Sequence, residues 1–259
     1  MFRDSIVYKY RKIDFKLEDI LKNNRFYFSS PESFNDPFDT SIVPSVEIPD
    51  EDLKSWYEET RTKLTFTPEQ RKEVDRVLES GEYKGEKFKK SVLAGIQNGL
   101  KEHGVISFSQ RNENILLWSH YGDNHCGVAV GVEVQKLQGD DRYLVEAHYS
   151  SEFPRINLNE TKMYQELMKR KYLCWEYEKE VRVIHRTGAG TYLDLGNDSI
   201  KEIIFGLKCT PDQIRDVIGW INWEKMNPVI GKASPKKHKY ELDFVEIKDV
   251  PRMGRGEPR

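Results

Sequence analysis

The segment formed by residues 175–182 constrains the fold most, because three acids alternate with other residues just before an apolar run. It reads Trp-Glu-Tyr-Glu-Lys-Glu-Val-Arg and continues as Val-Ile, a pattern typical of a strand. Residues two apart in a strand point to the same side of a sheet. We therefore expect Glu176, Glu178 and Glu180 to project together, with Arg182 on the same side. Like charges at this spacing repel one another, so the cluster is either a solvated strand face or a functional site.

The size and composition of the chain narrow the class of protein. Its 259 residues suffice for one large domain or for a domain with an insertion. The net charge of −2 gives no global basic field for nucleic acid, although residues 236–239 form a local basic cluster. The three cysteines lack a CxxC spacing, which indicates a reducing compartment and neither a disulfide framework nor a zinc site. No apolar run is long enough to span a membrane and no secretory leader is present, so we expect a cytoplasmic protein without membrane association.

Runs of β-branched and aromatic residues predict strands, and apolar residues at helical spacing predict helices. The predicted strands cover residues 5–10, 25–29, 104–109, 127–134, 143–149, 180–186, 200–205 and 240–247. The predicted helices cover residues 15–23, 67–78, 85–103 and 210–223, with one more after Asn159. Thr67 and Thr210 each begin a Thr-Pro-x-Gln pattern, which is a capping box with proline in the first turn. The order of elements predicts an α+β fold with a mixed, mostly antiparallel, twisted sheet.

Residues 49–103 differ from the rest of the chain because they are strongly charged and helical in pattern. We predict that they form a helical insertion in a single α+β domain that spans residues 1–250. Residues 251–259 are rich in glycine, proline and arginine, and we expect a flexible tail there.

Four segments carry more polar and aromatic residues than packing requires. The first, residues 8–11, fits an amphipathic edge strand. It also fits the floor of a pocket, where Tyr8, Tyr10 or Arg11 would stack on a ring or bind a phosphate.

The second segment, residues 34–39, has a proline after Asp36, which pushes that residue out of the helical region. Asn35 and Asp36 can satisfy a rigid turn with their own side chains. The alternative is that the same residues hold a ligand against Phe34 or Phe38.

The third segment, residues 107–121, contains an apolar stretch at residues 115–118 that we expect to enter the core. Ser119, His120 and Tyr121 would then lie on the next turn of a helix, where the histidine is either structural or catalytic. The chain lacks a Gly-x-Ser-x-Gly elbow, a P-loop, a Rossmann glycine pattern and the histidine-based zinc signatures, which disfavours those classes of enzyme. The fourth segment is the acidic one described first.

Together these segments resemble a bacterial family catalogued as domain of unknown function 2971. The resemblance covers most of the chain outside residues 49–103 and the tail, and it implies no activity. The matching phrases are Tyr8-Lys-Tyr-Arg11, Ser30-Pro-x-x-Phe-Asn-Asp-Pro-Phe-Asp39, Phe108-Ser109, Trp118-Ser-His-Tyr121, Asn124-His-x-Gly127, Trp175-x-Tyr-Glu-x-Glu-x-Arg182 and, more weakly, Ile203-Ile-Phe-Gly206.

The order of elements is also similar to that of the ADP-ribosyltransferase fold, in which a late strand often carries Glu-x-Glu. This resemblance implies an ADP-ribosyltransferase-like sheet, NAD as substrate with no metal, Glu180 as the catalytic residue and Glu178 as the acid beside the acceptor. A carboxylate next to the ribose stabilises the positive charge that develops as nicotinamide leaves. The residues that the resemblance assigns to NAD are Tyr8, Tyr10, Arg11, Ser29, Asn35, Asp36, Phe38, Ser109, Trp118, Ser119, His120, Tyr121 and Arg182.

Such a transferase would act on a nucleic-acid or protein acceptor. Resemblance to small bacterial transferases implies a toxin or a phage-defence effector with a cognate inhibitor, an antitoxin. Two other interpretations stay open. In one, Asp36, Asp39, Glu178 and Glu180 hold Mg²⁺ in a metal-dependent nuclease or phosphoesterase. Lys9 or Arg182 would then steady a phosphate. In the other, the chain is a non-catalytic binding module whose helical insertion docks another chain.

Overall fold

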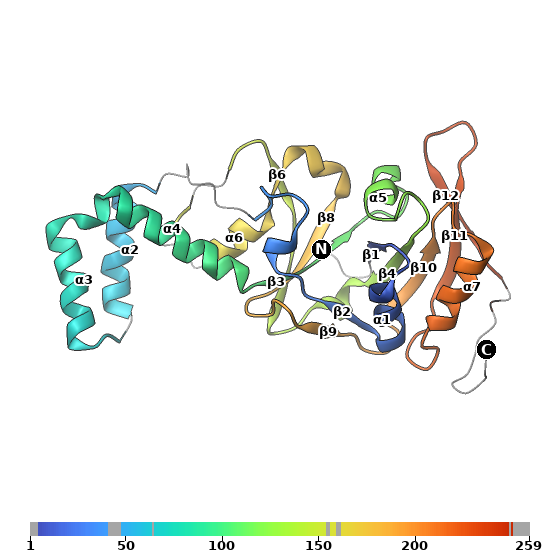
Figure 1. The fold of residues 1–259 in the computed structure, drawn as a ribbon, viewed down its shortest axis with the longest axis horizontal. Helices are drawn as coiled ribbons and strands as arrows, with labels where there is room; N and C mark the ends of the chain where they lie inside the picture. Colours follow the sequence, from blue (N-terminus) through green and yellow to red (C-terminus); the bar gives the residue numbers. More distant parts are fainter. Residues whose placement is uncertain are drawn as a thin grey trace. The chain divides into compact units, whose positions relative to one another are not determined.

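The computed structural model describes residues 5–40, 48–63, 65–153, 156–158, 162–248 and 250. They form a mixed α+β structure with a mostly antiparallel main sheet, as the sequence predicts. The chain divides into two compact units, one of residues 1–29, 104–147 and 174–259 and the other of residues 30–103 and 148–173 (Figure 1). The predicted tail lies outside the described residues, whereas the helix predicted after Asn159 is confirmed as α6 (Met163–Lys169). The single domain over residues 1–250 stays a prediction.

The first unit contains an eight-stranded sheet. Its strands are β1 (Ile6–Arg11), β3 (Gly104–Ser109), β4 (Val128–Glu133), β5 (Arg142–Glu146), β8 (Glu180–His185), β10 (Ile200–Phe205), β11 (Val229–Pro235) and β12 (Leu242–Glu246). They lie in the order β12-β11-β10-β4-β1-β3-β8-β5, and within this sheet the pair β10 and β11 alone is parallel. Strand β1 lies between β3 and β4, so the interpretation of residues 8–11 as an edge strand is wrong.

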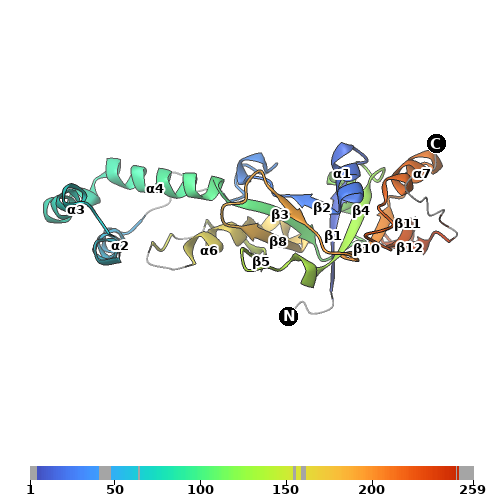
Figure 2. The same cartoon turned by 90° about the horizontal axis from the view of Figure 1, so that it is seen from below.

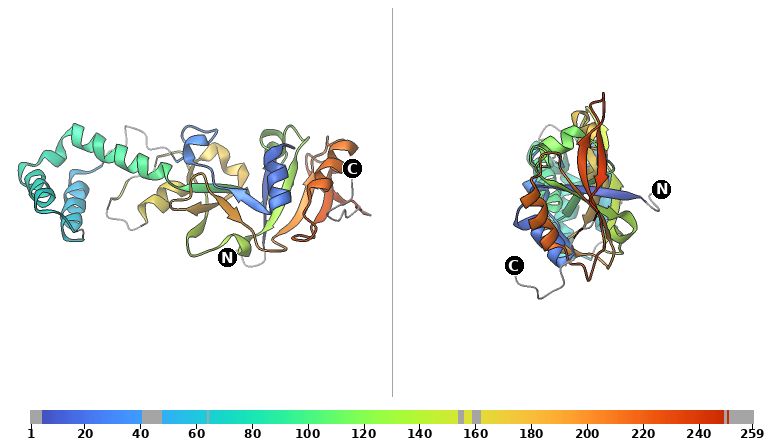
Figure 3. Two further views of the ribbon diagram at one scale, coloured as in Figure 1. Left: turned by 60° about the horizontal axis from the view of Figure 1, so that its bottom comes forward. Right: turned by 90° about the vertical axis from the view of Figure 1, so that its right-hand side faces the viewer.

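Two helices and a small two-stranded sheet cover one face of the main sheet (Figure 2 and Figure 3). They are α1 (Phe15–Asn23), α7 (Pro211–Trp220), β2 (Arg25–Tyr27) and β9 (Tyr192–Asp194). In α1, Leu17, Ile20 and Leu21 recur at helical spacing and are buried against the sheet. Asp14 caps the first turn of this helix by accepting from the N–H groups of Lys16 and Leu17. The helical spacing of these apolar residues and the cap at Asp14 therefore explain why α1 forms and which side of it faces the sheet.

Helix α5 (Ile115–His120) packs against the opposite face of the main sheet. Its buried residues Leu117 and Trp118 meet Tyr8 and Tyr10 of β1 in a second core cluster. The two preceding apolar residues stay exposed, because one side of this short helix meets the sheet. The expectation that this stretch enters the core is therefore confirmed for its second half.

The second unit consists mainly of helices, with one pair of parallel strands. Its elements are α2 (Asp50–Lys63), α3 (Pro68–Ser80), α4 (Glu86–Lys101), α6 (Met163–Lys169), β6 (His148–Ser150) and β7 (Arg170–Tyr172). The helical character predicted for residues 49–103 is confirmed, and the capping box at Thr67 opens α3 as predicted. The single strand predicted at residues 143–149 is wrong, because the chain passes there from β5 of the first unit to β6 of the second.

Short 3₁₀ helices complete the described structure. They are η1 (Pro31–Ser33), η2 (Glu82–Lys84), η3 (Val134–Leu137) and η4 (Leu173–Glu178). Among the helices that the structure describes, none has the length and apolar character needed to cross a membrane.

A tight backbone contact joins the turn after α5 to the turn after β10. Asp123, Asn124 and His125 are consecutive residues with positive φ angles of 50°, 53° and 71°, which residues with a side chain rarely adopt. The carbonyl oxygen of Gly127 accepts from the N–H of Gly206 at 2.8 Å. A Cβ atom at either glycine would clash with nearby backbone, so both positions need glycine.

Gly127→Ala should destabilise the first unit, because the added Cβ would clash with the carbonyl oxygen of Arg11. We expect the free energy of unfolding to fall by about 1–3 kcal/mol, the range for overpacking. Gly219→Ala in α7 is the matched control, since a Cβ there meets nothing within 4 Å, and it should raise stability by up to about 1 kcal/mol. Urea unfolding followed by circular dichroism measures both, and equal midpoints would contradict the clash.

Candidate functional site

One row of residues crosses the main sheet and joins three of the predicted segments. The register pairs Tyr8 of β1 with Ser109 of β3, and Ser109 with Glu180 of β8. Directly opposed residues on neighbouring strands point to the same face of a sheet. Tyr8, Ser109 and Glu180 therefore share the face against which α5 packs, and Arg182 follows two residues along β8 on that face.

Glu180 and Arg182 form a buried ion pair on β8. The side chain of Arg182 has no exposed surface, and that of Glu180 is 4% exposed. The Nε of Arg182 donates to Oε1 of Glu180 at 2.9 Å, and its Nη2 donates to Oε2 at 3.2 Å. Such a bidentate bond fixes the carboxylate plane and offsets part of the free energy lost when both charges leave water.

The strand predicted through residues 175–182 is wrong in its first half. The chain forms η4 there, and β8 begins only at Glu180. Between the two elements, Lys179 has a φ angle of 44°, so the backbone turns and the alternation of the three acids is broken. Glu176 pairs with Lys179 at 3.0 Å on the surface, whereas Glu178 is buried. The three acids therefore do not project together.

Glu178 nevertheless belongs to the same polar cluster as Glu180. Tyr121, at the C-terminal end of α5, donates its hydroxyl to Oε1 of Glu178 at 2.7 Å. Ser109 Oγ donates to the carbonyl oxygen of Glu178 at 2.6 Å. These two bonds tie the end of η4 to α5 and to β3 and hold Glu178 beside Ser109, the residue that lies opposite Glu180 in the register.

Aromatic side chains from α5 and η4 lie next to this cluster. His120 Nδ1 is 2.9 Å from the hydroxyl of Tyr177, and its ring stands edge-on to that of Trp175 with 6.4 Å between centroids. His120 is exposed and the other two are half-buried, so their rings offer a stacking surface. Trp118 differs, because it has no exposed surface and packs edge-on against Tyr10 at 5.0 Å. It is a core residue and not one that can stack on a ligand.

The hydroxyl groups of Tyr8 and Tyr10 are hydrogen-bond donors within the protein. Tyr8 donates to Oε2 of Glu202 at 3.0 Å, and Tyr10 donates to the carbonyl oxygen of Arg111 at 2.9 Å. Burial raises the pKa of both hydroxyl groups well above the ordinary value. Both tyrosines therefore keep their protons at neutral pH.

Ser119 is held within α5 itself. Its Oγ donates to the carbonyl oxygen of Ile115 at 2.9 Å and lies 3.2 Å from Nε2 of His125. Burial, together with the charge of Lys208, lowers the pKa of His125 and favours its neutral form. Because the serine proton is directed at a carbonyl oxygen, the pair is not arranged as a nucleophile and its base.

Arg11 and Ser29 lie away from the row that contains Glu180. Alternation along β1 points Lys9 and Arg11 to the face opposite Tyr8 and Tyr10. Arg11 and Ser29 line a cavity of about 490 Å³ on that opposite face, which α1 and β2 also border. The residues predicted to bind one dinucleotide are thus divided between the two faces of the sheet.

Lys9 is predicted from the sequence as a phosphate contact, but sequence reasoning missed other residues of this cavity, namely Lys16, Tyr27 and Tyr192. No signal in the sequence marks Tyr192, because it lies opposite Tyr27 only through the pairing of β9 with β2.

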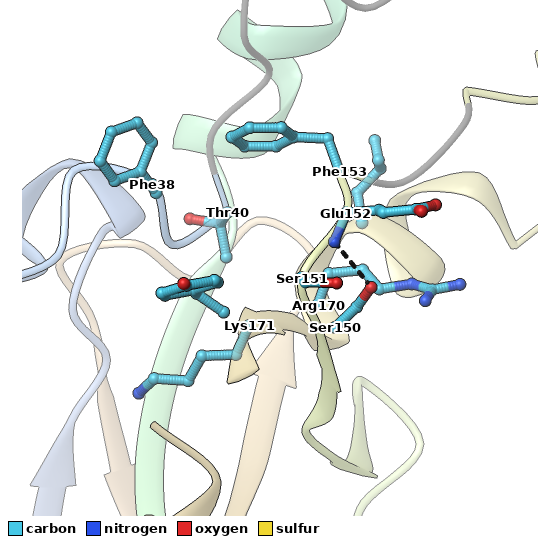
Figure 4. A pocket seen from close by; sticks show the side chains of 10 residues that line it. Phe38, Thr40, Ser150, Ser151, Glu152, Phe153, Arg170 and Lys171 are labelled. Atoms are coloured by element: carbon cyan, nitrogen blue, oxygen red, sulfur yellow. Dashed lines mark hydrogen bonds between the residues drawn. The ribbon is translucent and has the colours of Figure 1, made fainter. Parts of the chain in front are cut away.

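The predicted turn at residues 34–39 lies in the second unit. Asp36 Oδ1 accepts from the N–H of Phe38 at 2.9 Å, which confirms the rigid turn. Asn35 is exposed beside it. Phe38 is 61% exposed, and its ring lies 6.2 Å from that of Phe153 at a pocket of about 220 Å³ (Figure 4).

The described residues give no support to the Mg²⁺ cage of the nuclease or phosphoesterase interpretation. Asp39 pairs with the buried Lys171 at 3.6 Å, and Glu180 pairs with Arg182. Across the described part of the chain, no three His, Cys, Asp or Glu side chains are grouped so as to hold a metal ion. The carboxylates proposed for a cage are engaged in other contacts.

The sequence pattern of one protein family matches part of the chain. The family is described as "Protein of unknown function (DUF2971)", and the match covers residues 117–183. This span contains Tyr121, Glu178, Glu180 and Arg182, and the match supports the resemblance to that family. No curated protein matches the chain, and no solved structure matches it either.

Arg182→Met should destabilise the first unit strongly, because it removes the guanidinium that compensates the buried Glu180. We expect the free energy of unfolding to fall by about 3–5 kcal/mol, the range for breaking a buried pair. Arg111→Met is the control, since it removes an exposed pair with Glu113 at 3.0 Å, and it should change stability by less than about 1 kcal/mol. Denaturant unfolding measures the two losses, and similar values would show that burial of the pair is unimportant.

Proposed function

We propose that the chain is an NAD-dependent ADP-ribosyltransferase that modifies a nucleic-acid or protein acceptor without a metal. The observation that carries the proposal is the row across β1, β3 and β8, where Tyr8, Ser109 and Glu180 share one face. The sheet would then be of the ADP-ribosyltransferase type. In that type, a first strand, a serine-bearing strand and a late glutamate-bearing strand face one dinucleotide.

Glu180 is the proposed catalytic residue. In the reaction, the bond between ribose C1′ and the nicotinamide nitrogen breaks, and its electron pair leaves with nicotinamide. A carboxylate beside the ribose stabilises the positive charge that develops there, most strongly where water is excluded. Glu180 is nearly inaccessible to water, and Arg182 holds its carboxylate in a fixed orientation. That orientation exists before any substrate binds.

Glu178 is the proposed acid on the side of the acceptor. As the nucleophile of the acceptor bonds to C1′ it loses a proton, and a positioned carboxylate can take that proton. Tyr121 and Ser109 hold the side chain and the backbone of Glu178 in place. The half-buried ring of Tyr177 and the exposed ring of His120 lie beside it and can stack on nicotinamide or on an acceptor base.

The proposed biological role is that of a bacterial toxin or phage-defence effector that works in the cytoplasm. The resemblance to small bacterial transferases supports this role. An active transferase of this kind would need an inhibitor partner in its own host.

NAD consumption by the purified protein tests the proposal, with Glu180→Gln as the main variant. We expect the wild type to release nicotinamide in the presence of EDTA. Release should fall by about 100-fold or more in Glu180→Gln, because one transition-state electrostatic contact is lost. Glu246→Gln on β12 removes an exposed carboxylate of the same unit and should keep full turnover.

Glu180→Gln also weakens the ion pair with Arg182, so circular dichroism at the assay temperature must show that the variant is folded. Unchanged release by the folded variant would contradict the role of Glu180. No release by the wild type, together with no NAD-induced change in melting temperature, would contradict NAD chemistry altogether.

A further inference from the structure

We propose that the cavity bordered by α1, β1 and β2 binds a nucleoside phosphate, at a site separate from the row of Glu180. The cavity lies on the opposite face of the sheet, and its volume of about 490 Å³ is within the range of small-molecule sites. This inference goes beyond the proposed transferase activity and does not depend on it.

The charges around the cavity favour an anion. The cationic side chains that line it are those of Lys9, Arg11 and Lys16. The acid that lines it, Asp19, is held by Arg25 through hydrogen bonds of 2.8 to 3.2 Å. These bonds keep the pKa of Asp19 below its ordinary value. Arg25 compensates Asp19, and Asp14 lies 3.8 Å from Arg11 and 3.9 Å from Lys12. The cations around the cavity still outnumber the acids, which leaves a positive field that suits a phosphate.

Arg11 is the residue that points most directly to a phosphate. Its Nε is buried and makes no hydrogen bond, and its Nη2 is 3.8 Å from Asp14. Burial lowers the pKa of the guanidinium, while the charge of Asp14 raises it. A buried donor without an acceptor costs free energy. A phosphate oxygen in the cavity would accept from Nε and would pair with the guanidinium.

Aromatic rings at the same cavity indicate a base as the other part of the ligand. Phe15 is 73% exposed, and Tyr27 and Tyr192 are each about half exposed. The rings of Tyr27 and Tyr192 pack edge-on with centroids 5.3 Å apart, because β2 and β9 place them opposite each other. Clustered exposed rings often mark a ligand site. The guanidinium of Arg25 covers one face of the Tyr192 ring at 3.9 Å, so Phe15 and Tyr27 are the rings left for a base. An acidic peptide would pair with the cations only, whereas a nucleoside phosphate uses the cations and these rings.

Isothermal titration calorimetry with ADP tests the site. Adenosine and inorganic phosphate are titrated separately, to represent the nucleoside part and the phosphate part of ADP. We expect ADP to bind more tightly than either part alone. Arg11→Gln and Lys16→Gln should each weaken ADP binding by about tenfold, the scale for losing one charge-assisted hydrogen bond. Lys12→Gln is the matched control, because Lys12 is a neighbouring exposed cation that is not among the residues lining the cavity. Its ADP affinity should equal that of the wild type.

Lys16 is exposed on α1, so Lys16→Gln tests the site even if Arg11→Gln fails to fold. Glu180→Gln should leave ADP affinity unchanged, which separates this site from the proposed transferase. The proposal is overturned if ADP does not bind the wild type, if phosphate alone binds as tightly as ADP, or if Lys12→Gln weakens binding as much as Lys16→Gln. ADP binding that is lost in folded Glu180→Gln and kept in Lys16→Gln overturns it as well.

Discussion

Arg182 is fully buried in the main sheet, and the carboxylate of Glu180 compensates its charge. Removing an arginine from water costs several kcal/mol, which a bidentate carboxylate partly offsets. The neighbouring strand provides the space, because β3 places Ser107 opposite Arg182 and Ser109 opposite Glu180. Two small side chains thus face two long charged ones, and larger residues on β3 would crowd the pair. The small serines on β3 therefore suit this alignment of β3 with the buried pair of β8.

Strand β1 gives the sheet two chemically different faces. Tyr8 and Tyr10 point to the side of Glu180 and use their hydroxyls as donors, whereas Lys9 and Arg11 line the cavity on the other side. Because β1 is paired with β3 on one side and β4 on the other, its register is specified twice. A slip of one residue would exchange the two sets of side chains and destroy both surfaces. Both proposals depend on this one strand.

Local signals predict part of this structure, and non-local pairing determines the rest. Helix α1 and the capping boxes of α3 and α7 agree with the sequence, because apolar spacing and caps act within a few residues. The sequence does not predict β11, which contains a glycine and a proline and pairs in parallel with β10. It does not predict the turn at Lys179 either, because lysine rarely adopts a positive φ. Within the candidate site, the residue types of Tyr8, Ser109 and Glu180 are evident from the sequence, whereas their common row is visible only in the register.

The contact between Gly127 and Gly206 has a consequence for α5. Backbone hydrogen bonds at this contact join the turn that follows the helix to the turn that follows β10. Tyr121, which ends the helix just before that turn, reaches Glu178. These bonds hold α5 in place beside Glu178, so the wall there is formed by the fold itself. In the proposed transferase, an acceptor at Glu178 would have to match this existing shape, and selectivity would arise from rigid fit rather than from closure around the guest.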